Sequence, residues 1–368
     1  MSTKKDKFSI KDKFYMEIAL KLANSRQGLT GTNPSVGCVI VKNDKIVSIG
    51  QTSYNGRPHA EFNAIENCID DLNGSKMYVT LEPCCHHGLT PPCTNIIIKS
   101  KISEVIYSVS DIDKRVRNKS LKILKSNKIK VKKGLLDDKI NNFYSNYFFN
   151  RKNQLPYVTG KIAVSKNNLI YSKLNKKITN RHSDKFTHLL RYKNDALMVT
   201  YKTLNNDNSK LNCRIKGFSN FSPKRIILDN KLQTKINTYV INTANKNNTL
   251  IFYNQAKKSK ILEFKNKKIQ LIKSKINQQG KFDIKAILKK LYTHNCRNLL
   301  IEGGDSLTSH LLKNKIFNRF YLYKSPKNIP KETEYLKFNS LDVLKKNYKN
   351  KFNLNLYLGK DKITLYKN

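Results

Sequence analysis

The sequence predicts an α/β protein built from two domains, and three observations support this class. The chain has 368 residues, and one domain takes roughly 100–200 residues, so two buried cores fit into this length. Runs of β-branched residues alternate with stretches of helical spacing in both halves, as in helices layered on a sheet. A polar segment at 142–157 has the character of a linker. We therefore place the domains at residues 1–150 and 151–368.

The elements of the first domain follow from apolar residues at helical spacing, from β-branched runs and from turn residues. In order, they are a helix at 13–23, a hairpin at 36–50 that turns at Asn43-Asp44, a helix at 59–71, a strand at 76–81, a helix at 94–101 and a strand at 104–110.

The second domain gives a similar alternation with weaker signals. Its expected strands lie at 157–164, 196–200, 225–229 and 299–301, and its expected helices at 184–192 and from about residue 306 onward. The stretches 231–275 and 325–368 are rich in Lys and Asn and yield no pattern from which an element could be predicted. We detect no internal repeat.

The chain is strongly basic, but the charge is evenly spread. There are 71 Lys and Arg against 26 Asp and Glu, a formal net charge of +45. Clustered basic residues would indicate nucleic-acid binding. These lysines are instead scattered and accompany abundant Asn and Ile, which fits an AT-rich coding composition. We expect no nucleic-acid partner, and a nucleic-acid deaminase or RNA-binding protein is the more distant alternative.

Membrane and secreted classes are disfavoured. No run of about 18 apolar residues occurs, and the N-terminus has no apolar signal core. The seven cysteines are odd in number, which favours metal or structural roles in a reducing cytoplasm over a disulfide framework. We expect a cytoplasmic protein with no membrane partner.

One histidine and two cysteines are spaced as ligands of a catalytic zinc ion. Glu61 stands two positions after His59, and eight residues separate Cys84 from Cys93. An imidazole and two thiolates suit Zn²⁺ and leave a fourth position open to water, which indicates catalysis. In zinc deaminases the His-x-Glu and Pro-Cys pattern uses the Glu as an acid/base rather than as a ligand. We predict His59, Cys84 and Cys93 as ligands and Glu61 as the proton carrier.

A closed structural zinc site is the alternative at the same place. Four consecutive residues, Cys84, Cys85, His86 and His87, are potential ligands. Adjacent side chains point in different directions and rarely reach one metal, so we favour the catalytic site. The last three of these residues are then bystanders or substrate contacts.

Three segments of the first half resemble the bifunctional riboflavin-biosynthesis deaminase/reductase family, RibD. They are NPSVGCVIV at 33–41, PHAE at 58–61 and YVTLEPCCHHGLTPPC at 78–93, with a long cysteine spacing that is specific to this family. The resemblance implies a cytidine-deaminase-like domain that hydrolyses 2,5-diamino-6-(5-phosphoribosylamino)pyrimidin-4(3H)-one to 5-amino-6-(5-phosphoribosylamino)uracil. It supports the ligands and the role of Glu61 named above, and it implies that Asn33 contacts the substrate base.

The second half resembles, over roughly residues 157–311, the family's dihydrofolate-reductase-like domain. The matching segments are KIAVS at 161–165, a T-x3-D-x3-L-x2-R pattern from Thr203 to Arg214, and EGG at 302–304. The resemblance implies NADPH-dependent reduction of the ribose to a ribityl chain in a homo-oligomeric enzyme. The implied cofactor-binding residues are Ala163, Lys177, Thr203, Asp207, Asn230, Gly304, Asp305 and Ser306. The implied substrate-binding residues are Asn175, Arg191, Leu211, Arg214 and Glu302.

The sequence also departs from the family pattern. Leu89 replaces a Lys or Arg that the family has near the substrate phosphate, and Asn167-Asn168 replaces an Asp-Gly pair. Asn175 and Lys177 stand for a Ser-x-Trp pair, and the chain contains no Trp. Most departures fall in the second domain. A deaminase with a degenerate reductase domain that acts as a scaffold is therefore the main alternative.

Overall fold

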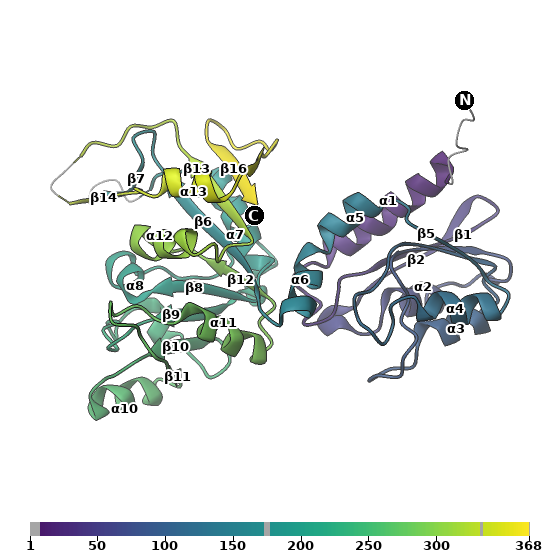
Figure 1. Ribbon diagram of the computed structural model, residues 1–368, viewed down its shortest axis with the longest axis horizontal. Coiled ribbons are helices and arrows are strands. Elements are labelled where there is room, and N and C mark those ends of the chain that lie inside the picture. Colours follow the sequence, from purple (N-terminus) through teal and green to yellow (C-terminus); the bar gives the residue numbers. More distant parts are fainter. Residues whose placement is uncertain (1–7, 173–176, 332–333, 368) are drawn as a thin grey trace. The chain divides into compact units, whose positions relative to one another are not determined.

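The computed structural model describes residues 8–172, 177–331 and 334–367, and the chain divides into two units between Gln154 and Leu155. Each unit has its own sheet and its own hydrophobic core. In Figure 1 the first unit runs from purple to blue and the second from teal to yellow.

The first unit contains a five-stranded sheet of order β2-β1-β3-β4-β5. Its strands are β1 (Gly37–Lys42), β2 (Lys45–Gln51), β3 (Lys76–Leu81), β4 (Glu104–Val109) and β5 (Lys130–Lys133). The β1–β2 hairpin is antiparallel, and β3, β4 and β5 are parallel. Asn43 and Asp44 both have positive φ angles, 51° and 61°, as a two-residue hairpin turn requires. The expected hairpin and its turn are confirmed.

Helices surround this sheet, and two glycines let them approach it closely. The helices are α1 (Ile10–Ser25), η1 (Tyr54–Gly56), α2 (Ala60–Glu66), α3 (Cys93–Lys99), α4 (Lys119–Ser126), α5 (Asp137–Phe143) and α6 (Ser145–Asn153). A Cβ on Gly37 would lie 1.9 Å from the Ala19 carbonyl oxygen of α1, and one on Gly50 would lie 2.2 Å from the Ala60 carbonyl oxygen of α2. Gly50 therefore fixes the start of α2 against the sheet, which is where the His-x-Glu motif lies.

The second unit contains a nine-stranded sheet of order β11-β10-β9-β8-β12-β6-β13-β16-β15. Its strands are β6 (Tyr157–Val164), β8 (Ala196–Thr200), β9 (Lys224–Leu228), β10 (Thr249–Tyr253), β11 (Gln270–Lys273), β12 (Asn298–Ile301), β13 (Arg319–Lys324), β15 (Asn350–Asn353) and β16 (Lys362–Lys367). The strands from β11 to β13 are parallel, and β16 and β15 continue the sheet antiparallel. A separate pair joins β7 (Leu169–Ser172) to β14 (Tyr335–Lys337).

Helices connect the parallel strands, as crossovers between parallel neighbours require. They are α7 (Arg181–Tyr192), α8 (Tyr201–Asp207), η2 (Ser219–Phe221), α9 (Tyr239–Asn242), α10 (Lys258–Asn266), α11 (Ile284–Thr293), α12 (Asp305–Lys313) and α13 (Leu341–Asn347). Asn180 caps α7 by accepting hydrogen bonds from the His182 and Ser183 amides. Because the connected strands are parallel, their carboxyl ends all meet at one edge of the sheet.

Two sequence interpretations need correction. The segment 142–157, interpreted as a linker, is largely the helix α6, because Tyr147 and Phe148 pack against the core of the first unit. The Lys- and Asn-rich stretches that showed no pattern contain β10, α10, β11, β14, α13, β15 and β16. Among the described residues, no helix is long and apolar enough to cross a membrane.

Candidate zinc centre and reductase site

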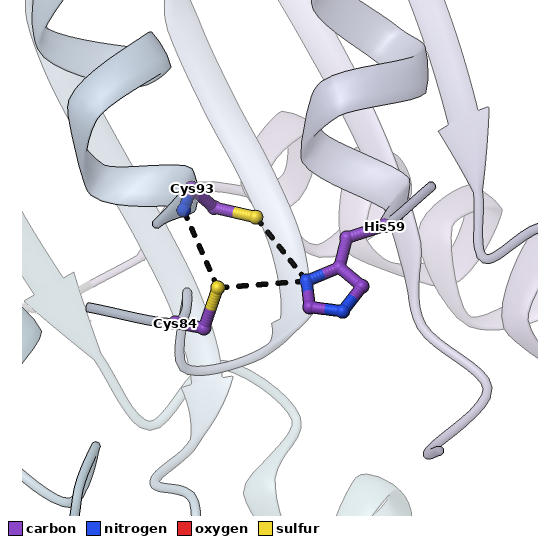
Figure 2. A group of neighbouring side chains, drawn as sticks. All are labelled: His59, Cys84 and Cys93. Carbon is purple, nitrogen blue, oxygen red and sulfur yellow. Dashed lines mark hydrogen bonds between the residues drawn. The ribbon is translucent and has the colours of Figure 1, made fainter. Parts of the chain in front are cut away.

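His59, Cys84 and Cys93 converge in the first unit as the sequence predicts. Their ligand atoms lie within 4.8 Å of one another. Figure 2 shows His59 Nδ1 facing both sulfur atoms, at 3.5 Å from Cys84 Sγ and 3.4 Å from Cys93 Sγ. One nitrogen and two sulfurs facing a common point are a donor set that suits Zn²⁺.

Local backbone structure places each of these donors. His59 is the N-cap residue of α2, Cys84 follows strand β3, and Cys93 is the first residue of α3. The Cys93 amide donates a hydrogen bond to Cys84 Sγ at 3.3 Å, and the Thr94 amide donates to the Cys84 carbonyl. Hydrogen bonds from Cys93 and His59 hold the pKa of the Cys84 thiol well below its usual range. This residue is thus prepared to be a thiolate ligand.

Glu61 lies in the first turn of α2 and is buried, with 4 % of its surface exposed. Burial raises the pKa of its carboxyl to about 7, although the neighbouring His59 acts in the opposite direction. A carboxyl group that titrates near neutral pH can both accept and return a proton. This property matches the acid/base role that the sequence predicts for Glu61.

The residues around the cluster separate into partners and bystanders. The Asn33 side-chain amide donates to the Gly56 carbonyl at 2.9 Å, which fixes the orientation of that amide. Gly56 has φ of 89°, and a Cβ there would lie 2.7 Å from Asn33 Cβ. Cys85 Sγ instead lies 3.5 Å from the Arg115 carbonyl oxygen, and His87 is exposed. Cys85, His86 and His87 stand outside the cluster, so the geometry does not favour the closed four-ligand alternative.

In the second unit, all the expected cofactor-binding residues except Lys177 follow or lie near the carboxyl ends of the parallel strands. Thr203 and Asp207 lie on α8 directly after β8, and Asn230 follows β9. Gly304, Asp305 and Ser306 begin α12 after β12, and Ala163 lies near the end of β6. The carboxyl edge of a parallel sheet is where such folds bind nucleotides.

The start of α12 is open to an approaching ligand. A Cβ built on Gly304 would meet no heavy atom within 4 Å, and Ser306 is exposed. The Asp305 side chain accepts a hydrogen bond from the Asn339 amide at 3.1 Å. Backbone without side chains at a helix start can approach a phosphate closely.

Arg191 and Glu302, both expected to bind substrate, form a forked ion pair. Arg191 Nε and Nη2 donate to the two Glu302 carboxylate oxygens at 2.8 and 2.9 Å. Arg191 Nη1 donates to the Asn212 carbonyl at 3.2 Å. Burial alone would raise the pKa of Glu302, but the charge and hydrogen bonds of Arg191 bring it down to about 2. The pair is therefore ionised at any physiological pH.

The charges of this pair act on Lys161, a residue to which the sequence alone assigned no role. Its Nζ lies 4.8 Å from the centre of the Tyr323 ring. Burial lowers the pKa of Lys161, and the nearby charge of Glu302 opposes that effect. The signal was present in the sequence as a lysine inside the otherwise apolar strand β6.

The remaining expected substrate-binding residues have mixed surroundings. Leu211 is buried with a positive φ of 52°, and the exposed Arg214 donates to the Asn212 side chain at 3.1 Å. Lys177, expected to bind the cofactor, forms an exposed ion pair with Asp184 at 2.8 Å. Asn175 lies outside the described residues.

Comparisons with known proteins cover both units. The zinc-binding region of cytidine and deoxycytidylate deaminases matches residues 9–109, and the RibD C-terminal domain matches residues 160–345. The chain is 33% identical over 318 residues to the riboflavin biosynthesis protein RibD of Aquifex aeolicus, covering 86% of this chain and 87% of that one. It is 35% identical over 315 residues to RibD of Actinobacillus pleuropneumoniae, covering 85% and 83%.

A solved structure resembles the whole chain. It is a diaminohydroxyphosphoribosylaminopyrimidine deaminase/5-amino-6-(5-phosphoribosylamino)uracil reductase from Thermotoga maritima. The match has a TM-score of 0.81 at 27% identity and covers 97% of this chain and 98% of the other. The order of the two domains is thus the same in both proteins.

Proposed function

The chain belongs to the RibD family and is a bifunctional deaminase and reductase of riboflavin biosynthesis, and from this premise we propose which residues perform each reaction. The deaminase would convert 2,5-diamino-6-(5-phosphoribosylamino)pyrimidin-4(3H)-one to 5-amino-6-(5-phosphoribosylamino)uracil. The reductase would then convert the ribose to a ribityl chain with NADPH. The observation that carries the deaminase assignment is His59 Nδ1 facing two thiols beside the buried carboxyl of Glu61.

His59, Cys84 and Cys93 would hold the zinc ion of the deaminase. Zinc in such a site, when bound, activates water at neutral pH. Glu61 takes the proton that the attacking water loses and passes it to a ring nitrogen, where it stays. Glu61 then carries the second proton, from the hydroxyl group of the adduct, to the departing amine. Water thereby adds at the carbon that bears the 2-amino group, the carbon–nitrogen bond breaks, and ammonia leaves. Asn33 orients the pyrimidine base.

The reductase site would use the carboxyl edge of the nine-stranded sheet. NADPH, when bound, supplies the hydride that is added at C1′ of the opened ribose. Thr203, Asp207, Asn230 and the residues that begin α12 would bind the cofactor, with Ala163 and Lys177 beside them. The substrate would contact Arg191, Leu211, Arg214 and Glu302, with Asn175 as a further expected contact. The fork between Arg191 and Glu302 fixes the direction of both side chains.

Product analysis tests both assignments in one experiment. The zinc-loaded chain is incubated with the diaminopyrimidine substrate and NADPH, and the products are separated and identified by mass spectrometry. We expect the ribityl product. Accumulation of the deaminated intermediate without NADPH consumption would support the alternative of a deaminase with a scaffold domain. Loss of reduction in Arg191→Ala and Asp207→Ala, with deamination retained, would support the bifunctional assignment.

Metal analysis tests the ligand set. We expect Cys84→Ser and Cys93→Ser to lose stoichiometric zinc, because each removes a thiolate from a three-residue site. Cys85→Ser is the matched control and should keep its zinc, because Cys85 Sγ faces the Arg115 carbonyl instead. Zinc retained in Cys93→Ser and lost in Cys85→Ser would overturn the assignment.

Three further expectations stay predictions. We expect a homo-oligomer, which light scattering of the purified chain would test. A cytoplasmic location and the absence of a nucleic-acid partner are also expected from the sequence. Saturable binding of RNA at physiological salt would contradict the last of these.

A further inference from the structure

Arg57 lies directly beside the zinc cluster. Its Nη1 is 3.3 Å from His59 Nε2, on the ring edge opposite the nitrogen that faces the two thiols. The same Nη1 donates a hydrogen bond to the Thr90 hydroxyl. The hydrogen bond to Thr90 holds the guanidinium between the histidine of the cluster and the turn that joins Cys84 to Cys93. The His59 contact only places the two groups side by side, because a histidine that binds zinc through Nδ1 carries its proton on Nε2 and does not accept there.

The charge of Arg57 has no acidic partner among the described residues. No carboxylate lies within ion-pair distance of it, although the side chain is half-buried. Arg115 in the same unit differs, because its guanidinium pairs with Asp113 at 2.6 Å. A partly desolvated cation without a counter-ion is unfavourable until an anion approaches it.

The turn itself provides no cation. Residues 84–93 contain neither Lys nor Arg, and Leu89 is 89% exposed there. A Cβ built on Gly88 would lie 3.6 Å from Arg57 Nη2 and 3.8 Å from His86 Nε2. The Arg57 guanidinium and the His86 imidazole therefore both lie next to Gly88. The positive charge at this turn comes from Arg57, which precedes the turn in the sequence.

We propose that Arg57 binds the phosphate group of the deaminase substrate. This role rests on the proposed function, since only a phosphorylated substrate at this cluster gives the guanidinium its anion. Both contacts of Arg57 are made by Nη1, which leaves Nε and Nη2 as donors for a phosphate. A guanidinium fork binds phosphate through two parallel hydrogen bonds, which gives orientation as well as affinity.

The test compares deamination of the phosphorylated substrate with that of its dephosphorylated form, using the zinc-loaded full chain. We expect Arg57→Ala to raise KM for the phosphorylated substrate by roughly 10- to 100-fold, the range for hydrogen bonds to charged groups. The KM for the dephosphorylated form and the zinc content should stay unchanged. Arg115→Ala is the matched control, because that arginine already has a carboxylate partner, and it should resemble the wild type.

Two further variants separate charge from structure. Arg57→Lys keeps the charge without the fork and should give an intermediate KM. Adding Leu89→Arg to Arg57→Ala should lower KM again for the phosphorylated substrate only. An Arg57→Ala variant that loses activity equally on both substrates, or keeps its KM on both, would overturn the role of Arg57. A wild-type chain that deaminates neither substrate would overturn the proposed function as well, so the two failures are distinguishable.

Discussion

The deaminase unit gathers its ligand atoms within 4.8 Å of one another from residues that lie at a helix start, after a strand and at a second helix start. The reductase unit distributes its expected ligands over the ends of several parallel strands, from Ala163 to Ser306. The first arrangement needs only two local motifs in the correct relative position. The second needs the parallel strands to assemble before the residues that follow different strands come together.

The two units also differ in the protonation of a carboxyl group at each site. Glu61 is a buried carboxyl whose pKa is raised to about 7, as a proton carrier requires. Glu302 is largely buried too, but its pKa is lowered to about 2 because Arg191 pairs with it. The first unit keeps one carboxyl ready to change its protonation state, whereas the second uses one to hold a fixed ionic pair.

The largest expected effect tests the proton carrier of the first unit. Glu61→Gln keeps the shape of the side chain but removes its ability to accept a proton. We expect deamination to fall by roughly 10²- to 10⁴-fold, the usual contribution of acid/base catalysis. Zinc content and reduction of the deaminated intermediate should be unchanged. A variant that deaminates at more than about a tenth of the wild-type rate would contradict the role of Glu61.

The next prediction breaks the fixed ion pair of the second unit. Arg191→Leu leaves Glu302 buried without its forked partner, and breaking such a pair destabilises a protein by about 3–5 kcal/mol. We expect the lower end of that range because Lys161 still faces Glu302. The free energy of unfolding, followed by circular dichroism in urea, is the measurement.

The double variant Arg191→Leu/Glu302→Leu serves as the control for that experiment. It removes both charges, so its stability should approach that of the wild type, while reduction should remain lost. Equal stability of the single and double variants would show that an unpaired Glu302 does not destabilise the unit, and would contradict this prediction.

A pH experiment probes the same region through His188, which is buried on α7. Burial lowers the pKa of His188 to about 4, and the positive charges of Arg191 and Arg214 act in the same direction, while Glu302 opposes them. In the unfolded chain the pKa is about 6.5. The unfolded state therefore binds more protons between these values, and stability falls as the pH falls from 6.5 through 4.

The magnitude follows from comparing the wild type with His188→Gln. Between pH 7.5 and 4.5 we expect the wild type to lose roughly 1–3 kcal/mol more stability than the variant. Other titrating groups, including Glu61, are shared by both proteins and cancel in the difference. Parallel pH profiles would mean that His188 keeps an ordinary pKa in the folded chain.

The sequence predicted best where one local pattern determines the structure. The Asn43-Asp44 turn and the three proposed zinc ligands each lie within a short motif whose chemistry is recognisable. The sequence-based interpretation was wrong for α6, because the many polar residues of this segment obscured its helical pattern. Its aromatic residues Tyr147 and Phe148 pack against the core of the first unit. The strand β15 was missed because it lies at the sheet edge, where polar and charged residues are tolerated on exposed positions. Its neighbour β16 begins and ends with a lysine, which hides the short apolar run between them.

Contacts between distant residues were beyond local patterns. The fork between Arg191 and Glu302 joins residues 111 positions apart, and either one alone reads as an ordinary surface charge. Arg57 and Thr90 are separated by 33 positions, so only the folded turn brings them together. Family resemblance named several of these residues, but their partners became visible only in three dimensions.

The smallest expected effect concerns Lys177, which pairs with Asp184 at the surface. Lys177→Ala should change the free energy of unfolding by only about 0.2–1 kcal/mol, because exposed ion pairs contribute little. Because we expect Lys177 to lie beside the cofactor, the same substitution should raise the KM for NADPH by roughly 3- to 10-fold. This increase should be smaller at high salt, which screens the charge of the lysine. Asp184→Asn is the matched control, since it releases the lysine and should leave this KM equal or lower. An increase beyond about 100-fold would mean that a desolvated lysine holds the cofactor, and that the reductase site is as tightly organised as the zinc cluster.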